Sequence, residues 1–180
     1  GNKMNRKLNI ELSESQKRFM DATADEVLFG GAAGGGKSYG QLADALIYAL
    51  KYPNSRQLIL RRTFPELEHS IIFTSLQMFP DEAAKYHSTA HKWEFKNGSL
   101  IEFGYCAAEK DVFRYQGAEY DVIRFDELTH FTQSQYIYLL SRLRGVNPYP
   151  KQIKSSTNPG GTGHSWVKER FIDGFEPNIE

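Results

Sequence analysis

The chain has 180 residues, of which 40% are apolar and 13% aromatic, and this length and composition fit a single domain with a substantial core. Its 22 basic and 22 acidic residues cancel, so the overall charge gives no reason to expect binding to nucleic acid, although a local basic patch is compatible with it. The single cysteine, Cys106, excludes an internal disulfide framework and is expected to be a small buried apolar residue. The sequence has no apolar run of the roughly 18 residues that cross a membrane and no charged-then-apolar leader, so we expect a cytoplasmic protein.

The first predicted element is a short helix near the N-terminus. Ser13 and Gln16 have the spacing of a capping box, and apolar residues follow them up to about Thr23. A short apolar run at 27–29 then predicts a buried strand. From residue 39 to residue 51 the sequence predicts an amphipathic helix, whose apolar face is formed by Leu42, Ala43, Leu46, Ile47 and Leu50.

The glycine-rich segment 30–38, between that strand and that helix, fits the pattern G-x-x-x-x-G-K-[ST]. Strand, glycine loop and helix in this order let backbone amides and a helix N-terminus converge on a phosphate group. Lys37 is expected to reach the β- and γ-phosphates, and the Ser38 hydroxyl is expected to be a magnesium ligand. The alternative is a flexible turn that happens to end in Lys-Ser. The residues assigned to nucleotide binding here are Gly31, Ala32, Ala33, Gly34, Gly35, Gly36, Lys37, Ser38 and Tyr39.

A second buried strand is predicted at 57–61, and it closes with Arg61 and Arg62. These arginines lie at the carboxyl end of a strand, where they face phosphate or a neighbouring subunit, or else form the solvated edge of a turn. A helix with Pro65 at its first position follows and ends near residue 79. Further along, apolar segments flank an Asn-Gly pair, which predicts a β-hairpin near residues 92–103, within the sheet or at its edge.

The segment 120–127 is a mostly apolar strand that ends in two adjacent carboxylates, Asp126 and Glu127. Open α/β sheets place their chemistry at the carboxyl ends of their strands. We expect Asp126 to belong to the magnesium shell and Glu127 to orient and polarise an attacking water. Arg124 interrupts the apolar run, which predicts that one side of this strand is polar or covered by another element. The histidines are scattered without the spacing of metal ligands, so we expect no metal site built from them.

The remaining sequence predicts a helix, a strand and a final helix. Thr132 and Gln135 form a second capping box, for a helix that extends to about residue 144 and carries Arg142 and Arg144 in its last turn. Residues 152–157 predict a strand that ends in the polar tip Ser156, Thr157 and Asn158. Such a tip is suited to sensing a γ-phosphate by hydrogen bonds, or it is a simple Asn-Pro-Gly turn. Ser165 is expected to cap a helix over 166–171.

Together these stretches resemble the ATPase domain of phage large terminase subunits, the motors that package viral DNA into procapsids. The resemblance covers about residues 13–171, and its matching segments are 31–38, 115–131, 140–145, 156–161 and 164–168. It implies an α/β fold of the P-loop NTPase (ASCE) type, in which helices flank a mostly parallel sheet. It implies ATP and Mg²⁺ as cofactors and the host cell cytoplasm as the location. The implied partners are double-stranded DNA, the small terminase subunit, the portal protein and further copies in a homo-oligomeric ring, with no membrane.

Carried over residue by residue, the resemblance makes Ser156, Thr157 and Asn158 γ-phosphate sensors that couple hydrolysis to motion. It makes Gln16 a contact of the adenine edge, since an amide both donates and accepts hydrogen bonds; the alternative is an exposed polar residue on a helix. Family members usually continue into a metal-dependent nuclease domain. We therefore expect residues 1–180 to be a single P-loop ATPase domain, excised or truncated, with the nuclease domain absent.

The arginine finger departs from the family pattern. Many relatives have an arginine immediately before the glycine matched by Gly117, where this chain has Gln116. Arg114 is the nearest substitute, so we assign it as a candidate catalytic residue beside Lys37 and Glu127, with Arg61 and Arg62 as rivals. The alternative is that Arg114 is a solvated residue on a short helix.

Two other functions compete with a packaging ATPase. A P-loop ATPase of helicase or recombination type shares the first two motifs, but it has less reason for the segments around residues 117–121 and 157–161. A nucleotide-gated assembly module would bind ATP and hydrolyse it poorly alone. Glu127 argues against pure binding, because a water-orienting carboxylate has little use without hydrolysis.

Overall fold

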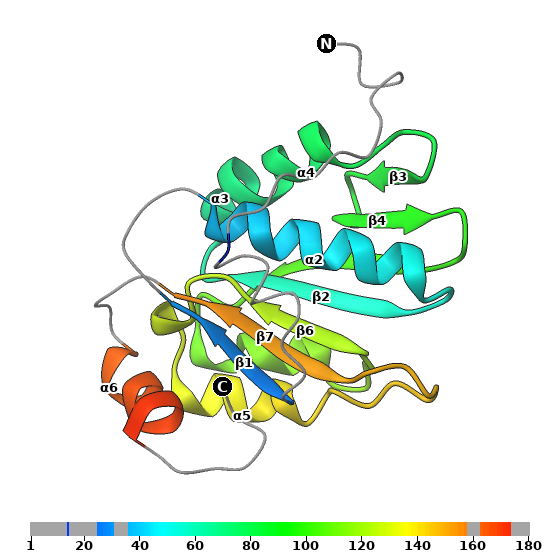
Figure 1. Ribbon diagram of the computed structural model, residues 1–180. Helices are drawn as coiled ribbons and strands as arrows, with labels where there is room; N and C mark the ends of the chain where they lie inside the picture. The colour runs from blue at the N-terminus through cyan, green and yellow to red at the C-terminus, as the bar shows by residue number, and fades with distance from the viewer. Residues whose placement is uncertain (1–13, 15–24, 31–35, 158–162, 174–180) are drawn as a thin grey trace.

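The computed structural model describes residues 14, 25–30, 36–157 and 163–173, and the structural statements below concern these residues. They form one seven-stranded sheet in the order β1-β7-β6-β2-β5-β4-β3 (Figure 1). The five strands from β1 to β5 in this order pair in parallel, and β4 and β3 add antiparallel pairs at one edge. The strands are β1 Glu26–Phe29, β2 Arg56–Arg61, β3 Ala84–His87, β4 Lys92–Phe95, β5 Leu100–Tyr105, β6 Val122–Phe125 and β7 Gln152–Ser156.

Helices cover both faces of this sheet (Figure 1). On one face lie α2 Lys37–Lys51, α3 Phe64–Glu66, the π-helical η2 Leu67–Ile72 and α4 Phe73–Met78. On the other face lie the 3₁₀-helical η3 Glu109–Tyr115 and η4 Leu128–His130, α5 Gln133–Leu140, α6 His164–Lys168 and the π-helical η5 Glu169–Asp173. None of the described helices is long and apolar enough to cross a membrane.

Each face of the sheet has its own apolar core. Leu42 and Leu46 of α2 pack against η2, α4 and the antiparallel strands, whereas Tyr136 and Leu139 of α5 pack under β6 and β7. Cys106 is buried in the second core, as its sequence context predicted, and burial raises the pKa of its thiol to about 12. The predicted fold class, a mostly parallel sheet flanked by helices, is confirmed.

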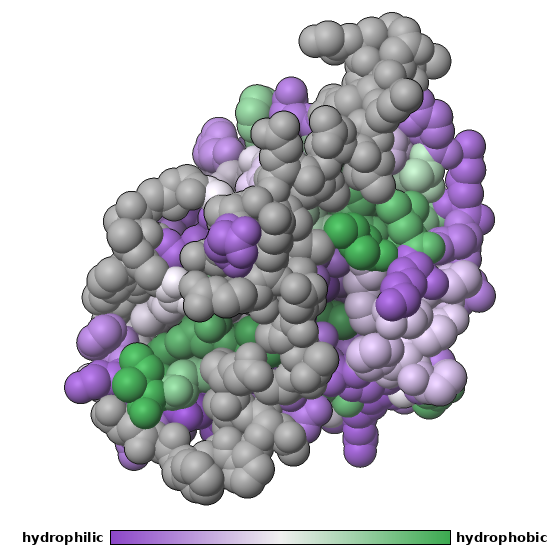
Figure 2. Space-filling view, in the orientation of Figure 1, coloured by the Kyte–Doolittle hydropathy of each residue, from purple (hydrophilic) through white to green (hydrophobic). Residues whose placement is uncertain are grey.

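The apolar stripe of α2 is narrower than its sequence suggests. Leu42, Ala43 and Leu46 are fully buried, but Ile47 and Leu50 are each 38% exposed. Figure 2 shows that the face of the molecule turned to the viewer carries hydrophobic areas among hydrophilic ones. The core therefore uses only part of the predicted helical face.

The predicted hairpin is confirmed as the β4–β5 pair. Its turn contains Gly98 at a φ of 88°, a conformation that favours glycine, and a Cβ there would clash with the side-chain oxygen of Asn54. Because β5 also pairs in parallel with β2, the hairpin joins the parallel sheet to its antiparallel edge. The strand β3, which completes that edge, was not predicted.

Three helix predictions were wrong at their boundaries or in their type. The helix after Pro65 passes through the π-helical segment η2, where the Ser70 hydroxyl donates to the Glu66 carbonyl and competes with the backbone donors. The helix α5 ends at Leu140, so Arg142 lies beyond it, with its carbonyl accepting from the Tyr120 N–H. The same is true of Arg144, which also lies beyond the end of α5.

The last described helical segment also begins earlier than predicted. Gly163 is the N-cap of α6, without a side-chain hydrogen bond, and Ser165 lies inside the helix. The indole N–H of Trp166 donates to the Phe131 carbonyl at 2.9 Å, which anchors the first turn against the segment that follows η4. Tertiary contacts therefore fix this helix start, in place of the predicted serine cap.

Candidate functional site

Polar side chains from α2, β6 and β7 meet at the carboxyl edge of the sheet. The Ser38 hydroxyl, in the first turn of α2, donates to Asp126 Oδ2 at 2.9 Å, although the two residues are far apart in sequence. The Ser156 hydroxyl, at the end of β7, donates to the other carboxylate oxygen of Asp126 at 2.8 Å. The fold thus brings Ser38, Asp126 and Ser156 together, although they come from three separate elements.

The helix α2 starts at this same point. Its N-cap, Gly36, has a φ of 112°, and its carbonyl accepts from the Gly40 N–H at 2.8 Å. Lys37 and Ser38 are therefore the first two helical residues, where the helix dipole favours an anion. Tyr39 packs against the core beneath α2. Several predicted site residues lie outside the described residues: Gln16, Gly31, Ala32, Ala33, Gly34, Gly35 and Asn158.

The sequence did not predict the partners of Arg61. Its guanidinium donates through Nη1 to Asp126 Oδ2 at 2.9 Å, and its Nη2 lies 3.0 Å from Glu127 Oε2. Nη1 also donates to the Ser70 hydroxyl at 2.7 Å, and the Arg61 side chain is only 11% exposed. Arg61 therefore binds both carboxylates of its own chain, a position that becomes predictable only once β2 is known to lie beside β6.

Glu127 has an unusual backbone conformation, with φ 59° and ψ 63°. A left-handed conformation costs a residue other than glycine about 1–2 kcal/mol, so the surrounding structure must hold it there. The side chain is held by Arg61 and by His130, whose Nδ1 lies 3.0 Å from Glu127 Oε2. With this backbone turn directly after β6, both neighbouring carboxylates contact the Arg61 guanidinium.

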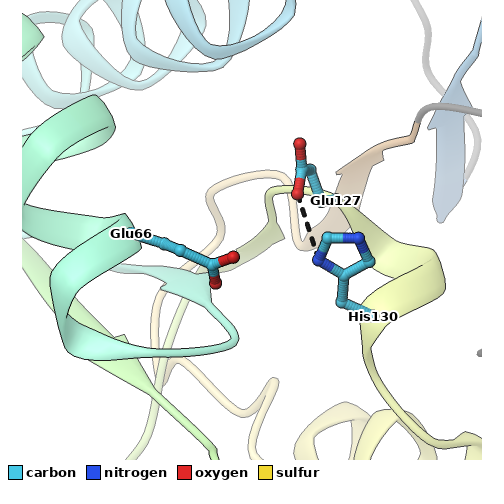
Figure 3. Close-up of side chains that lie close together, drawn as sticks. All are labelled: Glu66, Glu127 and His130. Carbon is cyan, nitrogen blue, oxygen red and sulfur yellow. Dashed lines mark ion pairs between the residues drawn. The ribbon is translucent and has the colours of Figure 1, made fainter. Parts of the chain in front are cut away.

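Glu66 completes a small cluster with Glu127 and His130 (Figure 3). Ligand atoms of the three side chains all lie within 4.8 Å of one another, and Glu66 comes from α3, across from the other two. The Thr63 hydroxyl donates to Glu66 Oε2 at 3.0 Å. This group of residues could accept a cation, a possibility that the scattered histidines of the sequence did not indicate.

The electrostatics of Asp126 are set by its burial. Burial raises the pKa of Asp126 above its usual range, and Arg61 and the hydroxyls of Ser156 and Ser38 oppose that shift. A divalent cation would favour the charged carboxylate in the same way, and magnesium prefers oxygen ligands such as a carboxylate and a hydroxyl. The paired oxygens of Ser38 and Asp126 therefore fit a magnesium ion.

The other predicted site residues lie around this centre. The Thr157 hydroxyl donates to the Thr129 hydroxyl at 3.4 Å, and its N–H donates to the carbonyl of Phe29, at the end of β1. Arg62 donates to the carbonyls of His130 and Ala107, at 2.7 and 2.6 Å.

Arg114 lies on η3, and its side chain is 46% exposed. It pairs with Asp111 at 3.4 Å, and its guanidinium lies 4.5 Å from the ring centre of Tyr105. Tyr105 is the last residue of β5, and Asp111 lies on η3 itself. Arg114 is thus more exposed than Arg61 and less constrained.

The family described as terminase large subunit, T4likevirus-type, N-terminal, matches residues 28–176. No curated protein sequence matches the chain. Among solved structures, the large terminase of a thermophilic bacteriophage matches with a TM-score of 0.73 at 17% identity, over 91% of this chain and 43% of that chain. The HK97 bacteriophage large terminase matches with a TM-score of 0.71 at 14% identity, over 94% and 38%.

A third match is the ATPase domain of the Thermus phage P74-26 large terminase, with a TM-score of 0.65 at 16% identity over 96% of this chain and 74% of that chain. The first of these proteins, from the thermophilic bacteriophage, has also been solved in complex with ADP and with ATP-γ-S. The chain spans less than half the length of that large terminase and of the HK97 large terminase. At these identities, the structural likeness supports the fold and not the chemistry.

Proposed function

The chain belongs to the family of T4-type terminase large subunits, as their N-terminal domain, and on this premise we propose that it binds ATP with magnesium and hydrolyses it to drive DNA packaging. The observation that carries this proposal is the meeting of Ser38, Asp126 and Arg61 at the start of α2, with Glu127 beside them. These residues come from separate elements and supply the groups that phosphoryl transfer requires.

Binding of the nucleotide is assigned to the start of α2 and the glycine loop before it. Residues 31–36 would cradle the phosphates with their backbone amides, and the Lys37 ammonium would neutralise the β- and γ-phosphates. Gln16 would contact the adenine edge. The ADP and ATP-γ-S complexes of the large terminase from the thermophilic bacteriophage support an adenine nucleotide as the ligand.

The metal is assigned to Ser38 and Asp126. When bound, magnesium would offset the negative charge of the β- and γ-phosphates. Asp126 is held ready for that role because two hydroxyls and one guanidinium bond its carboxylate. Arg61 balances the charge of the two neighbouring carboxylates until the metal and nucleotide arrive.

Glu127 is assigned to the attacking water. Its carboxylate would accept a hydrogen bond from the water and hold its oxygen in line with the γ-phosphorus. Arg61 and His130 both contact Glu127 Oε2, which restricts the side chain and therefore where that water can lie. Ser156, Thr157 and Asn158 would report the loss of the γ-phosphate through β7.

Arg114 remains the proposed arginine finger. Arg61 and Arg62 are held by groups near the site in their own chain, whereas Arg114 is about half exposed, and a turn toward a neighbouring subunit would cost only its exposed contacts with Asp111 and Tyr105. If a neighbour supplies the arginine, the isolated domain should turn over slowly and a ring should turn over faster. The proposed partners are DNA, the small terminase subunit, the portal protein and further copies of this chain, in the host cytoplasm.

Nucleotide binding and phosphate release, measured on the same protein, test this function. We expect binding of a fluorescent ATP analogue that requires magnesium, and phosphate release that rises with protein concentration or with double-stranded DNA. Binding without turnover under all of these conditions would instead favour a nucleotide-gated assembly module. Absence of binding would exclude both functions.

A further inference from the structure

Three charged side chains are buried together between α2 and the sheet, and we call Asp44, Arg124 and Lys154 the buried charge cluster. Asp44 Oδ2 lies 2.5 Å from Arg124 Nη1 and 3.0 Å from Lys154 Nζ. The side chains are 10%, 1% and 4% exposed, respectively. Arg124 and Lys154 face each other across the β6–β7 pair. The sequence predicted that this side of the strand is polar or covered by another element; it is both, and the covering element is α2.

Two glutamine side chains also contact Arg124 of the cluster. The Gln57 side chain on β2 accepts from Arg124 Nε at 3.0 Å, and the Gln41 side chain on α2 accepts from Arg124 Nη1 at 3.3 Å. Gln41 also donates to the Lys154 carbonyl at 2.8 Å. The helix α2 is thus bonded to β6 and β7 by directional contacts in addition to apolar packing.

Stability alone is a weak reason for this arrangement. Taking charges out of water costs several kcal/mol per ion, and apolar residues of similar volume are often as stable or more stable. Buried polar contacts do fix one register between packed elements, because any displacement leaves a charge unpaired. The buried charge cluster therefore has the properties of a device that sets the position of α2.

The same three elements supply the polar centre of the site. Ser38 precedes Asp44 on α2, Asp126 follows Arg124 on the β6 side, and Ser156 follows Lys154 on β7. Ser38 and Asp44 are six residues apart, which is a rise of about 9 Å along a helix, and two residues of a strand span about 7 Å. Each of the three elements therefore supplies one residue to the buried charge cluster and one residue to the layer above it. The buried layer holds the cluster, and the layer above it holds the bonds from Ser38 and Ser156 to Asp126.

We propose that Asp44, Arg124 and Lys154 are positioning residues that set magnesium affinity, because they hold α2 at the height where Ser38 meets Asp126. The inference rests on the proposed function and adds a determinant of its metal dependence. Magnesium requires near-ideal octahedral geometry at about 2.0–2.1 Å, so a small shift of α2 weakens metal binding more than it weakens the contacts of a nucleotide without metal.

The test is a magnesium titration of nucleotide binding, with MANT-ATP as the probe and the whole chain as the protein. Asp44→Asn keeps the size of the side chain and removes its charge. We expect the magnesium concentration for half-maximal binding to rise about tenfold, a typical effect of losing a residue that supports metal ligands. Affinity for MANT-ATP in EDTA should change by less than about twofold, since Asp44 touches no group assigned to the phosphates.

Asp121→Asn is the matched control. Asp121 is another buried carboxylate, 3.2 Å from Lys151 Nζ, but it precedes β6 at the opposite end from Asp126. We expect this variant to lose stability and to keep the magnesium dependence of the unmodified chain. A similar rise in magnesium requirement for Asp121→Asn would show general loosening of the fold and overturn the proposal.

A second variant covers the case in which Asp44→Asn does not fold. Lys154→Met leaves the Asp44–Arg124 pair intact and is expected to raise the magnesium requirement by a smaller factor, about threefold. An unchanged magnesium titration in the folded variants, with or without lowered stability, overturns the proposal. If the unmodified chain binds no MANT-ATP, the proposed function itself fails, which is a separate result.

Discussion

Arg61 offers the sharpest test of how the two carboxylates are held. In Arg61→Ala, Asp126 and Glu127 lose the guanidinium that lies 2.9 and 3.0 Å from their oxygens. The Asp126 side chain is 2% exposed, and water that enters the space left by Arg61 can replace a hydrogen bond but not the positive charge. We expect the nucleotide-free variant to be clearly less stable than the unmodified chain.

The size of the effect follows from burial. Removing one partner of a buried ion pair typically costs about 3–5 kcal/mol, because the remaining charge stays buried without compensation. For a chain of this length, 1 kcal/mol shifts the melting temperature by about 2–4 °C, so a loss of about 3 kcal/mol corresponds to roughly 6–12 °C. Magnesium and ADP should recover much of this loss, because the metal then supplies positive charge beside Asp126.

Thermal and urea denaturation, each with and without magnesium and ADP, measure both parts of this prediction. Arg62→Ala is the matched control, because its guanidinium donates to two backbone carbonyls and to neither carboxylate. Its cost should be about 1–2 kcal/mol and should not depend on the metal. A loss below about 1 kcal/mol for Arg61→Ala, or equal behaviour of the two variants, would refute the reasoning.

Three further predictions concern pH, assembly and the hairpin. Burial raises the pKa of Asp126 in the folded chain, so the free energy of unfolding without metal should fall as pH rises through that raised pKa. Asp126→Asn should remove this part of the pH dependence. Identical pH slopes of the two proteins in urea denaturation would contradict the prediction. Arg114→Ala should abolish the rise of specific ATPase activity with protein concentration and leave nucleotide affinity unchanged, and a variant that keeps the rise would exclude Arg114 as the finger. Gly98→Ala should destabilise the chain by about 1–3 kcal/mol in urea denaturation, since a Cβ there meets Asn54 and the φ is positive; unchanged stability would show that the turn relaxes.

The sequence predicted the structure correctly where a local residue pattern determines the local conformation. The Asn-Gly pair specifies the turn between β4 and β5, and the apolar run before Asp126 specifies a buried strand whose tip lies at the carboxyl edge of a parallel sheet. The glycine pattern put Ser38 at the end of the loop, directly before a helix predicted from residue 39, and in the structure α2 begins two residues earlier, at Lys37. From these, the meeting of Ser38 and Asp126 could be expected before any coordinates.

The contacts of Arg61 and Arg124 could not be predicted in the same way. Both depend on strand order, because Arg61 reaches Asp126 only when β2 lies beside β6, and Arg124 needs Asp44 of α2 above it. The strand β3 was missed because its four residues, Ala-Lys-Tyr-His, alternate over too short a run to stand out, and they are stabilised by pairing with β4. In each case the missing information was which distant element lies beside the residue, and local sequence does not carry it.

The central claim is that this domain hydrolyses ATP with Glu127 acting on the attacking water. The most direct measurement compares nucleotide binding and phosphate release in Glu127→Gln and Lys37→Ala. Because Lys37 is assigned to the bound phosphates and Glu127 to the transition state, Glu127→Gln should bind MANT-ATP with nearly unchanged affinity and release no phosphate, whereas Lys37→Ala should not bind. Phosphate release by Glu127→Gln at the rate of the unmodified chain would contradict the account.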